Sequence, residues 1–165
     1  MIYVKVSAIV HPTEDPKKVI QAISALFNDI KLEQKTKETI EPELGDSHSL
    51  LVSGAGGLDL LLTLHGLIRR EKIIDSIRNK VFSKNLSCGG LSVRFFLNKQ
   101  AAFIGIPSIS TQNESLGSIE IIIMAESQKE MERLFEWLLP ITEKGIPIVE
   151  VKMDYVEKVS DFRNL

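Results

Sequence analysis

The residues best suited to binding chemistry are basic side chains concentrated in the middle of the chain. Residues 49–105 hold eight Lys and Arg against three Asp and Glu, a net charge of +5. Residues 1–48 (six basic, eight acidic) and 106–165 (six basic, eleven acidic) have net charges of −2 and −5. Cations that share one face neutralise RNA phosphates, and nearby aromatic rings stack on bases. The candidate RNA or partner contacts are Arg69, Arg70, Lys72, Arg78, Lys80, Arg94, Asn98, Lys99 and Gln100.

An alternative explanation for the basic segment is pairing with the acidic C-terminal third, within one subunit or between two. The aromatic content does not decide between the two explanations. Phe95, Phe96 and Phe103 accompany the cations, but aromatic residues make up 6% of the chain. Phe95 also alternates with its apolar neighbours on the predicted core face, which leaves Phe96 or Phe103 for an exposed position. Both explanations stay open.

The triplet Asn98-Lys99-Gln100 is the most specific polar cluster, and it invites interpretation as an active-site triplet. It lies within LSVRFFLNKQAAFIG, residues 91–105, between two apolar runs. Asparagine tolerates the backbone angles of a tight turn, so this arrangement predicts a β-hairpin with Asn98 and Lys99 as its loop. The alanines at 101 and 102 would then lie opposite two phenylalanine rings and leave room for them.

Recognisable catalytic or metal-binding patterns are absent from the sequence. The three histidines, His11, His48 and His65, are far apart, and no Cys-x-x-Cys or His-x-x-x-His spacing occurs. Cys88 is the lone cysteine and has no neighbouring His or Lys that would activate its thiol. We therefore expect no metal, no cofactor and no catalytic residue, and we favour a protein that is not an enzyme, although catalytic residues can converge from distant positions.

The glycines of Gly54-Ala55-Gly56-Gly57 resemble a phosphate-binding loop before an apolar helix. The Gly-Lys-Ser/Thr ending of a P-loop is missing, because Leu58-Asp59 follows. The cluster therefore predicts a flexible connector. A nucleotide sensor built on this loop remains a third, weaker alternative.

The elements that position these residues are indicated by hydrophobic periodicity. Alternation predicts strands at 2–8, 49–52, 91–97, 119–123 and 145–151, and a polar edge strand within 31–40. The 119–123 strand is apolar enough to be central and buried on much of both faces. Helical spacing predicts helices over 16–27, 58–68, 73–81 and 127–138, the first capped by Asp15 and the last by Ser127 with Glu130.

This order of elements predicts an α+β fold with a mixed or mostly antiparallel sheet and helices packed on one face. At 165 residues, we expect a single domain over 1–153 followed by a charged tail over 154–165. The apolar runs are too short to cross a membrane, and the N-terminus does not resemble a signal peptide. We expect a cytoplasmic protein.

Two segments carry a family resemblance: LIRREKIIDSIR at 67–78 and FLNKQAAFIG at 96–105. Together with PTEDP at 12–16 and LGSI at 116–119, they resemble the archaea-specific uncharacterised protein family 201, also called domain of unknown function 54. Ser76-Ile77 departs from the Thr-Ala pair more common in that family. The resemblance implies a fold similar to the ribosomal protein that binds 5S RNA, and a homodimer. It implies no activity and no catalytic residue.

Our leading hypothesis is thus a non-enzymatic archaeal protein that binds RNA or a ribonucleoprotein through residues 69–99. The alternative is a dimeric protein-interaction or structural module that binds no nucleic acid.

Overall fold

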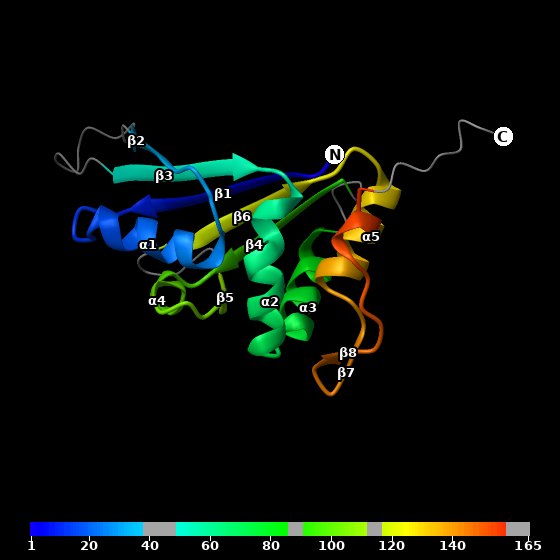
Figure 1. Cartoon of the computed structure of the whole chain (residues 1–165). Coiled ribbons are helices and arrows are strands. Elements are labelled where there is room, and N and C mark those ends of the chain that lie inside the picture. Colours follow the sequence, from blue (N-terminus) through cyan, green and yellow to red (C-terminus); the bar gives the residue numbers. More distant parts are fainter. Residues whose placement is uncertain (38–48, 86–90, 112–116, 158–165) are drawn as a thin grey trace.

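The computed structural model describes residues 1–37, 49–85, 91–111 and 117–157. Within them, six strands form an antiparallel sheet in the order β2-β3-β1-β6-β4-β5. Figure 1 shows the larger helices gathered on one side of this sheet. The expected α+β fold with a helix-covered face is confirmed.

The sheet is built around β1 (Tyr3–Val10), whose alternate side chains are buried against the helices. Antiparallel β3 (Ser49–Gly56) and β6 (Ile119–Met124) flank β1. The polar strand β2 (Glu33–Lys37) forms one edge, as its lysines predicted, because edge charges discourage pairing with another sheet. The remaining strands are β4 (Ser92–Leu97) and β5 (Ile109–Ser110), which forms the other edge.

The strand β6 is central, as expected, but it is buried on one face only. Ile119, Ile121 and Ile123 lie in the core, whereas Ile122 is half-buried and Met124 is exposed. Among the described residues, the helices cover a single face of the sheet, so the apolar composition of β6 overstated its burial.

The predicted helices form close to their expected bounds. Their ranges are α1 (Pro16–Leu26), a 3-10 turn η2 (Leu58–Leu61), α2 (Leu62–Arg70), α3 (Ile74–Asn85) and α5 (Gln128–Leu138). Asp15 caps α1 by accepting a hydrogen bond from the Lys17 backbone N–H at 3.0 Å. Ser127 caps α5 by accepting a hydrogen bond from the Glu130 N–H, which confirms the predicted cap. The Glu130 side chain accepts from the Glu126 N–H, one residue before the Ser127 N–H that the capping box requires.

The predicted hairpin at Asn98-Lys99 is wrong: this segment is the short helix α4 (Lys99–Phe103). The Asn98 side chain accepts a hydrogen bond from the Ala101 N–H at 2.9 Å and so caps the helix. Asparagine favours helix N-caps as well as turns, and alanine is the best helix former. The strand β4 pairs instead with β6 and, across residues 96–97, with β5.

Gly54, Ala55 and Gly56 end the strand β3, and Gly57 precedes η2, so the cluster is not the flexible connector that we expected. A Cβ atom on Gly54 would lie 2.7 Å from the Lys31 backbone oxygen, and one on Gly56 would lie 2.8 Å from Leu60 Cδ1. These residues are therefore glycine because other segments cross the strand closely. Both lie in the ladder with β1, which removes the loop on which the nucleotide-sensor alternative depended.

After α5 the chain forms a small separate hairpin of β7 (Thr142–Glu143) and β8 (Ile146–Pro147), so the strand predicted over 145–151 is mostly wrong. A 3-10 turn, η3 (Met153–Tyr155), follows, and Val156 returns to the core. The rest of the predicted tail, from residue 158, lies outside the described residues. Within the described part of the chain, no helix is long and apolar enough to cross a membrane.

Candidate nucleic-acid interface

The candidate contact residues do not share one surface. Arg94 lies on the sheet face that the described helices leave open, in β4. The other arginines and Lys72 and Lys80 belong to α2, α3 and the turn between them, on the helical side. Asn98, Lys99 and Gln100 lie in or beside α4.

Arg69 is committed to contacts within the chain. Its guanidinium donates to the Glu150 carboxylate at 2.8–2.9 Å, to the Trp137 backbone oxygen at 2.8 Å and to the His65 backbone oxygen at 3.0 Å. These bonds join α2 to the end of α5 and to the segment after β8. Arg69 therefore stabilises the fold, and its role as an RNA or partner contact stays a prediction.

Arg94 is also paired with the acidic C-terminal third, through Glu120 on the neighbouring strand β6 at 2.6 Å. Its guanidinium lies 5.0 Å from the centre of the Phe96 ring. For Arg69 and Arg94, pairing of the basic segment with the acidic third within one subunit is thus confirmed.

Lys99 is buried, which contradicts its predicted role as a surface contact. Its side chain is 7% exposed, and Nζ donates to Glu14 Oε1 at 3.0 Å and to the Ile9 backbone oxygen. The His11 backbone N–H donates to the same Glu14 oxygen at 3.1 Å. A charge with this little water needs a paired partner, and the pair joins α4 to the turn before α1. The Asn98 side chain caps α4, and the Gln100 side chain is exposed.

Arg78 lines a separate groove, beside Phe82 and Phe135. Of the remaining cations, Lys80 lines an open cleft of about 820 Å³ between α3 and the segment that leads into β5. Its lining consists of Glu71, Ile73, Ser76, Asn79, Lys80, Ile106, Pro107, Ser108 and Ile109. Arg70 joins the two walls, because Nη2 donates to the Gly105 backbone oxygen and Nε to Glu71 Oε1, each at 3.0 Å. Lys72 and Lys80 are exposed.

Sequence reasoning identified the cations of this cleft but missed Ser76, Asn79 and Ser108. Single serine and asparagine residues on a helix face or in a loop carry no signal of their own. The two walls lie about 30 positions apart in the chain, so no local spacing joins them.

Exposed apolar residues lie beside the cleft at the end of α4. Phe103 is 37% exposed and Ile104 is 69% exposed, and Gly105, which accepts the Arg70 hydrogen bond, follows directly. In the same segment Phe95 is buried in the core. Phe103 is therefore the aromatic ring that is best placed for stacking on a base. It is one of the two rings, Phe96 or Phe103, that the sequence left for an exposed position.

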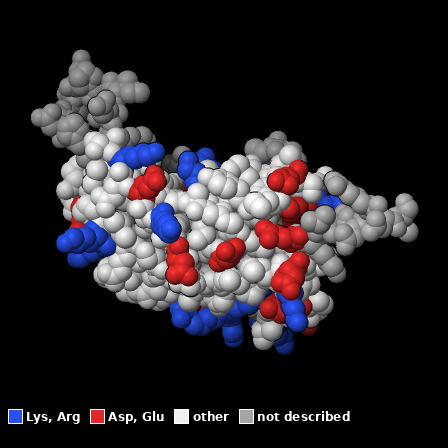
Figure 2. Space-filling model, turned by 45° about the horizontal axis from the view of Figure 1, so that its top comes forward, with Lys and Arg blue, Asp and Glu red and all other residues white. Residues whose placement is uncertain are grey.

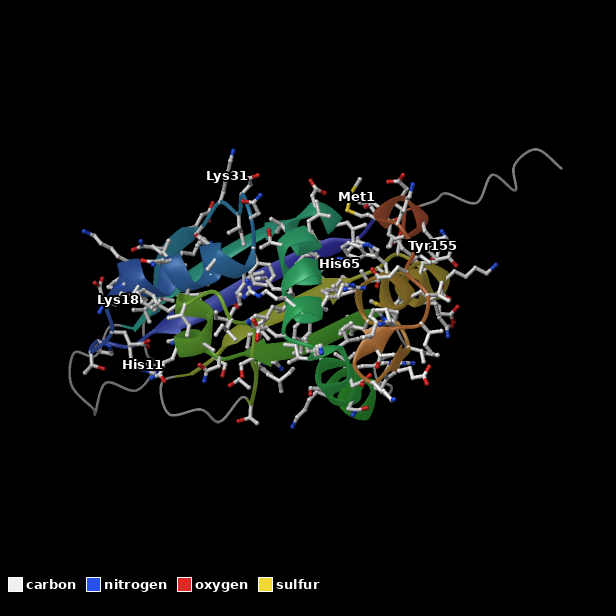
Figure 3. The ribbon with its side chains drawn as sticks, turned by 60° about the horizontal axis from the view of Figure 1, so that its bottom comes forward. Met1, His11, Lys18, Lys31, His65 and Tyr155 are labelled. Carbon is white, nitrogen blue, oxygen red and sulfur yellow. The ribbon has the colours of Figure 1, made fainter. Side chains whose placement is uncertain are left out.

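His65 lies in α2, far from His11, as Figure 3 shows. Its ring stacks on Trp137 with the ring centres 4.5 Å apart. Burial, helped by the nearby Arg69 charge, lowers the pKa of His65 below its usual value. His48 and Cys88 lie outside the described residues. Within the described part, no group of three or more His, Cys, Asp or Glu is arranged to hold a metal ion.

Arg94, the candidate cation on the open side of the sheet, is paired with Glu120. On the face that Figure 2 displays, acidic and basic side chains are interspersed with broad uncharged surface. An RNA backbone requires an excess of cations along its path.

Comparisons with known proteins show the family of the chain. A family model described as RNA binding matches residues 3–125. A UPF0201 protein of Methanosarcina acetivorans is 64% identical over 158 residues, which cover 96% of each chain. A UPF0201 protein of Methanopyrus kandleri is 36% identical over 90% of this chain and 91% of its own.

Among solved structures, a UPF0201 protein from Methanococcus jannaschii superposes with a TM-score of 0.74 at 28% identity, over 89% of this chain and 99% of its own. A DUF54 protein from Methanothermobacter thermautotrophicus matches the fold with a TM-score of 0.54 at 17% identity, over 76% and 85% of the two chains.

Proposed function

Because the chain belongs to the archaeal UPF0201 family, and to the family whose model is described as RNA binding, we propose that it binds RNA through the cleft between α3 and residues 106–109. The observation that carries the proposal is the cleft itself, with Lys80 in its lining, Arg70 bonded across it and exposed Lys72 in the turn that leads into α3. All of them lie inside the matched segment. The role is one of binding, in the cytoplasm, without catalysis.

The physical basis is neutralisation of phosphates. Each contact between a lysine and a phosphate of single-stranded RNA releases bound counterions, so affinity falls with salt with a slope of about 0.7 per contact on a double-logarithmic plot. Replacement of Arg70 would also remove its hydrogen bonds to Gly105 and Glu71, which join the two walls of the cleft, so the test changes the lysines.

The test is fluorescence anisotropy with labelled RNA over a range of salt concentrations. In the double variant Lys72→Gln/Lys80→Gln, we expect weaker binding and a salt slope lower by about 1.4. The matched control is Lys17→Gln/Lys18→Gln, which removes the same charge from the exposed face of α1. This helix contributes no residue to the lining of the cleft. Equal losses in both variants would contradict binding at the cleft, and no RNA binding by the native protein would refute the function.

A second surface supports the homodimer that we also propose. Ile141, Ile146, Ile148 and Val149 are each 60–66% exposed around the β7–β8 hairpin. They adjoin a groove of about 560 Å³ that is lined by Phe82 and Phe135 and flanked by Arg78 and Glu132. An apolar centre with both charge signs at its rim suits a twofold contact, in which one patch meets its own copy.

A further inference from the structure

The cleft combines apolar walls with polar side chains in a way that suits a flat ring. Ile73, Ile106 and Ile109 supply apolar surface, whereas Asn79 and Ser108 supply donors and acceptors. Its volume of about 820 Å³ is that of a small-ligand pocket. A planar base has apolar faces and a polar edge, which this lining matches.

The carboxylate of Glu71 indicates which part of an RNA enters. Glu71 lines the cleft, and the Arg70 Nε–H, 3.0 Å from Oε1, holds its side chain in place. A carboxylate repels phosphate and accepts hydrogen bonds from N–H groups. The phosphates therefore belong at the exposed cations around the cleft, and an N–H-bearing base belongs inside it.

We infer that the cleft binds one unpaired base of single-stranded RNA, and that guanine fits best. This inference rests on the proposed function and specifies its ligand. Guanine presents a ring N–H and an adjacent amino group, a pair of donors that one carboxylate accepts together. In a duplex both donors are engaged by cytosine, so only an unpaired guanine can offer them. Exposed Phe103, near the cleft, supplies a ring for stacking of a neighbouring base.

The experiment compares the affinities of RNAs of equal length for the native protein by anisotropy. The RNAs are oligouridine, the same strand with one central guanosine, the same strand with one central adenosine, and the guanosine strand annealed to its complement. A pair of well-made hydrogen bonds to a base discriminates by about 1–3 kcal/mol, so we expect the guanosine strand to bind at least about 5-fold more tightly than oligouridine. The adenosine strand and the duplex should lack this gain.

The variant Glu71→Gln should lose the preference for guanosine while it keeps its affinity for oligouridine. The matched control is Glu33→Gln on the edge strand β2, an exposed glutamate outside the lining of this cleft that undergoes the same change of charge. Circular dichroism checks that each variant folds. Asn79→Ala, at an exposed position in the cleft, is a second route to the same loss if Glu71→Gln does not fold.

Failure of the inference is distinct from failure of the proposed function. Binding of all single strands with equal affinity, or a guanosine preference that survives Glu71→Gln, would overturn the inference and leave RNA binding intact. Tighter binding of the duplex than of the guanosine single strand would also overturn the inference and leave RNA binding intact. If guanosine monophosphate alone bound as tightly as the strand, the ligand would be a free nucleotide and the inference would be wrong. The absence of binding to any RNA would refute the proposed function itself.

Discussion

Replacement of Lys99 by methionine tests whether this buried lysine stabilises the fold or contacts a ligand. The substitution keeps the aliphatic stem and removes the ammonium group, which leaves Glu14, 15% exposed, without its ion-pair partner. Breaking a buried ion pair costs about 3–5 kcal/mol. Glu14 keeps the His11 N–H and some solvent, so we expect the low end of that range, about 3 kcal/mol.

For a chain of this size, a loss of 3 kcal/mol lowers the Tm by roughly 6–12 °C, to be measured by circular dichroism. The double variant Lys99→Met/Glu14→Gln removes both charges, so it should recover at least about 1 kcal/mol relative to the sum of the single changes. Lys18→Met, on the exposed face of α1, is the control and should change stability by less than about 0.5 kcal/mol.

The reasoning would be refuted if Lys99→Met were as stable as the native protein, or if the double variant lost the full sum. RNA affinity of the folded Lys99→Met variant should equal that of the native protein. A tenfold loss of affinity would mean that Lys99 contacts RNA after all.

Two further predictions concern the His65–Trp137 stack and the hairpin surface. The pKa of His65 is lower in the folded state than in the unfolded chain. As the pH falls, His65 is therefore protonated in the unfolded chain before it is protonated in the folded protein. The free energy of unfolding should decrease as the pH drops from about 6.5 through the folded pKa. Urea unfolding at a series of pH values, followed by the fluorescence of Trp137, the single tryptophan, measures this decline. The variant His65→Gln should show a smaller fall in stability with pH. An equal fall in that variant would assign the decline to other groups. For the hairpin surface, Ile148→Asp should convert the proposed dimer to a monomer in sedimentation velocity, whereas Lys144→Asp, in the adjacent turn, should leave it associated. A sedimentation coefficient unchanged by Ile148→Asp would place the interface elsewhere.

Much of the fold was predictable because its signals are local. The alternation in β1 and the caps at Asp15 and Ser127 each act over a few residues, and each formed as expected. The same local reasoning failed at Asn98, because asparagine suits both a turn and a helix cap. In the structure the segment is helical, α4 contacts α1, and Lys99 of α4 forms an ion pair with Glu14. The ion pair joins residues 85 positions apart, which no sequence window contains.

The sequence by itself determined the α+β class, the caps of α1 and α5, the family resemblance and the basic character of the middle segment. Tertiary structure alone decided how that positive charge is used. Arg69 and Arg94 are neutralised by acidic residues of the C-terminal third, and Lys99 is buried with Glu14. Lys72 and Lys80 stay exposed beside a cleft whose walls come from distant segments. The physical reason is that a charge acts through space, on whichever side chains the fold brings within a few ångströms.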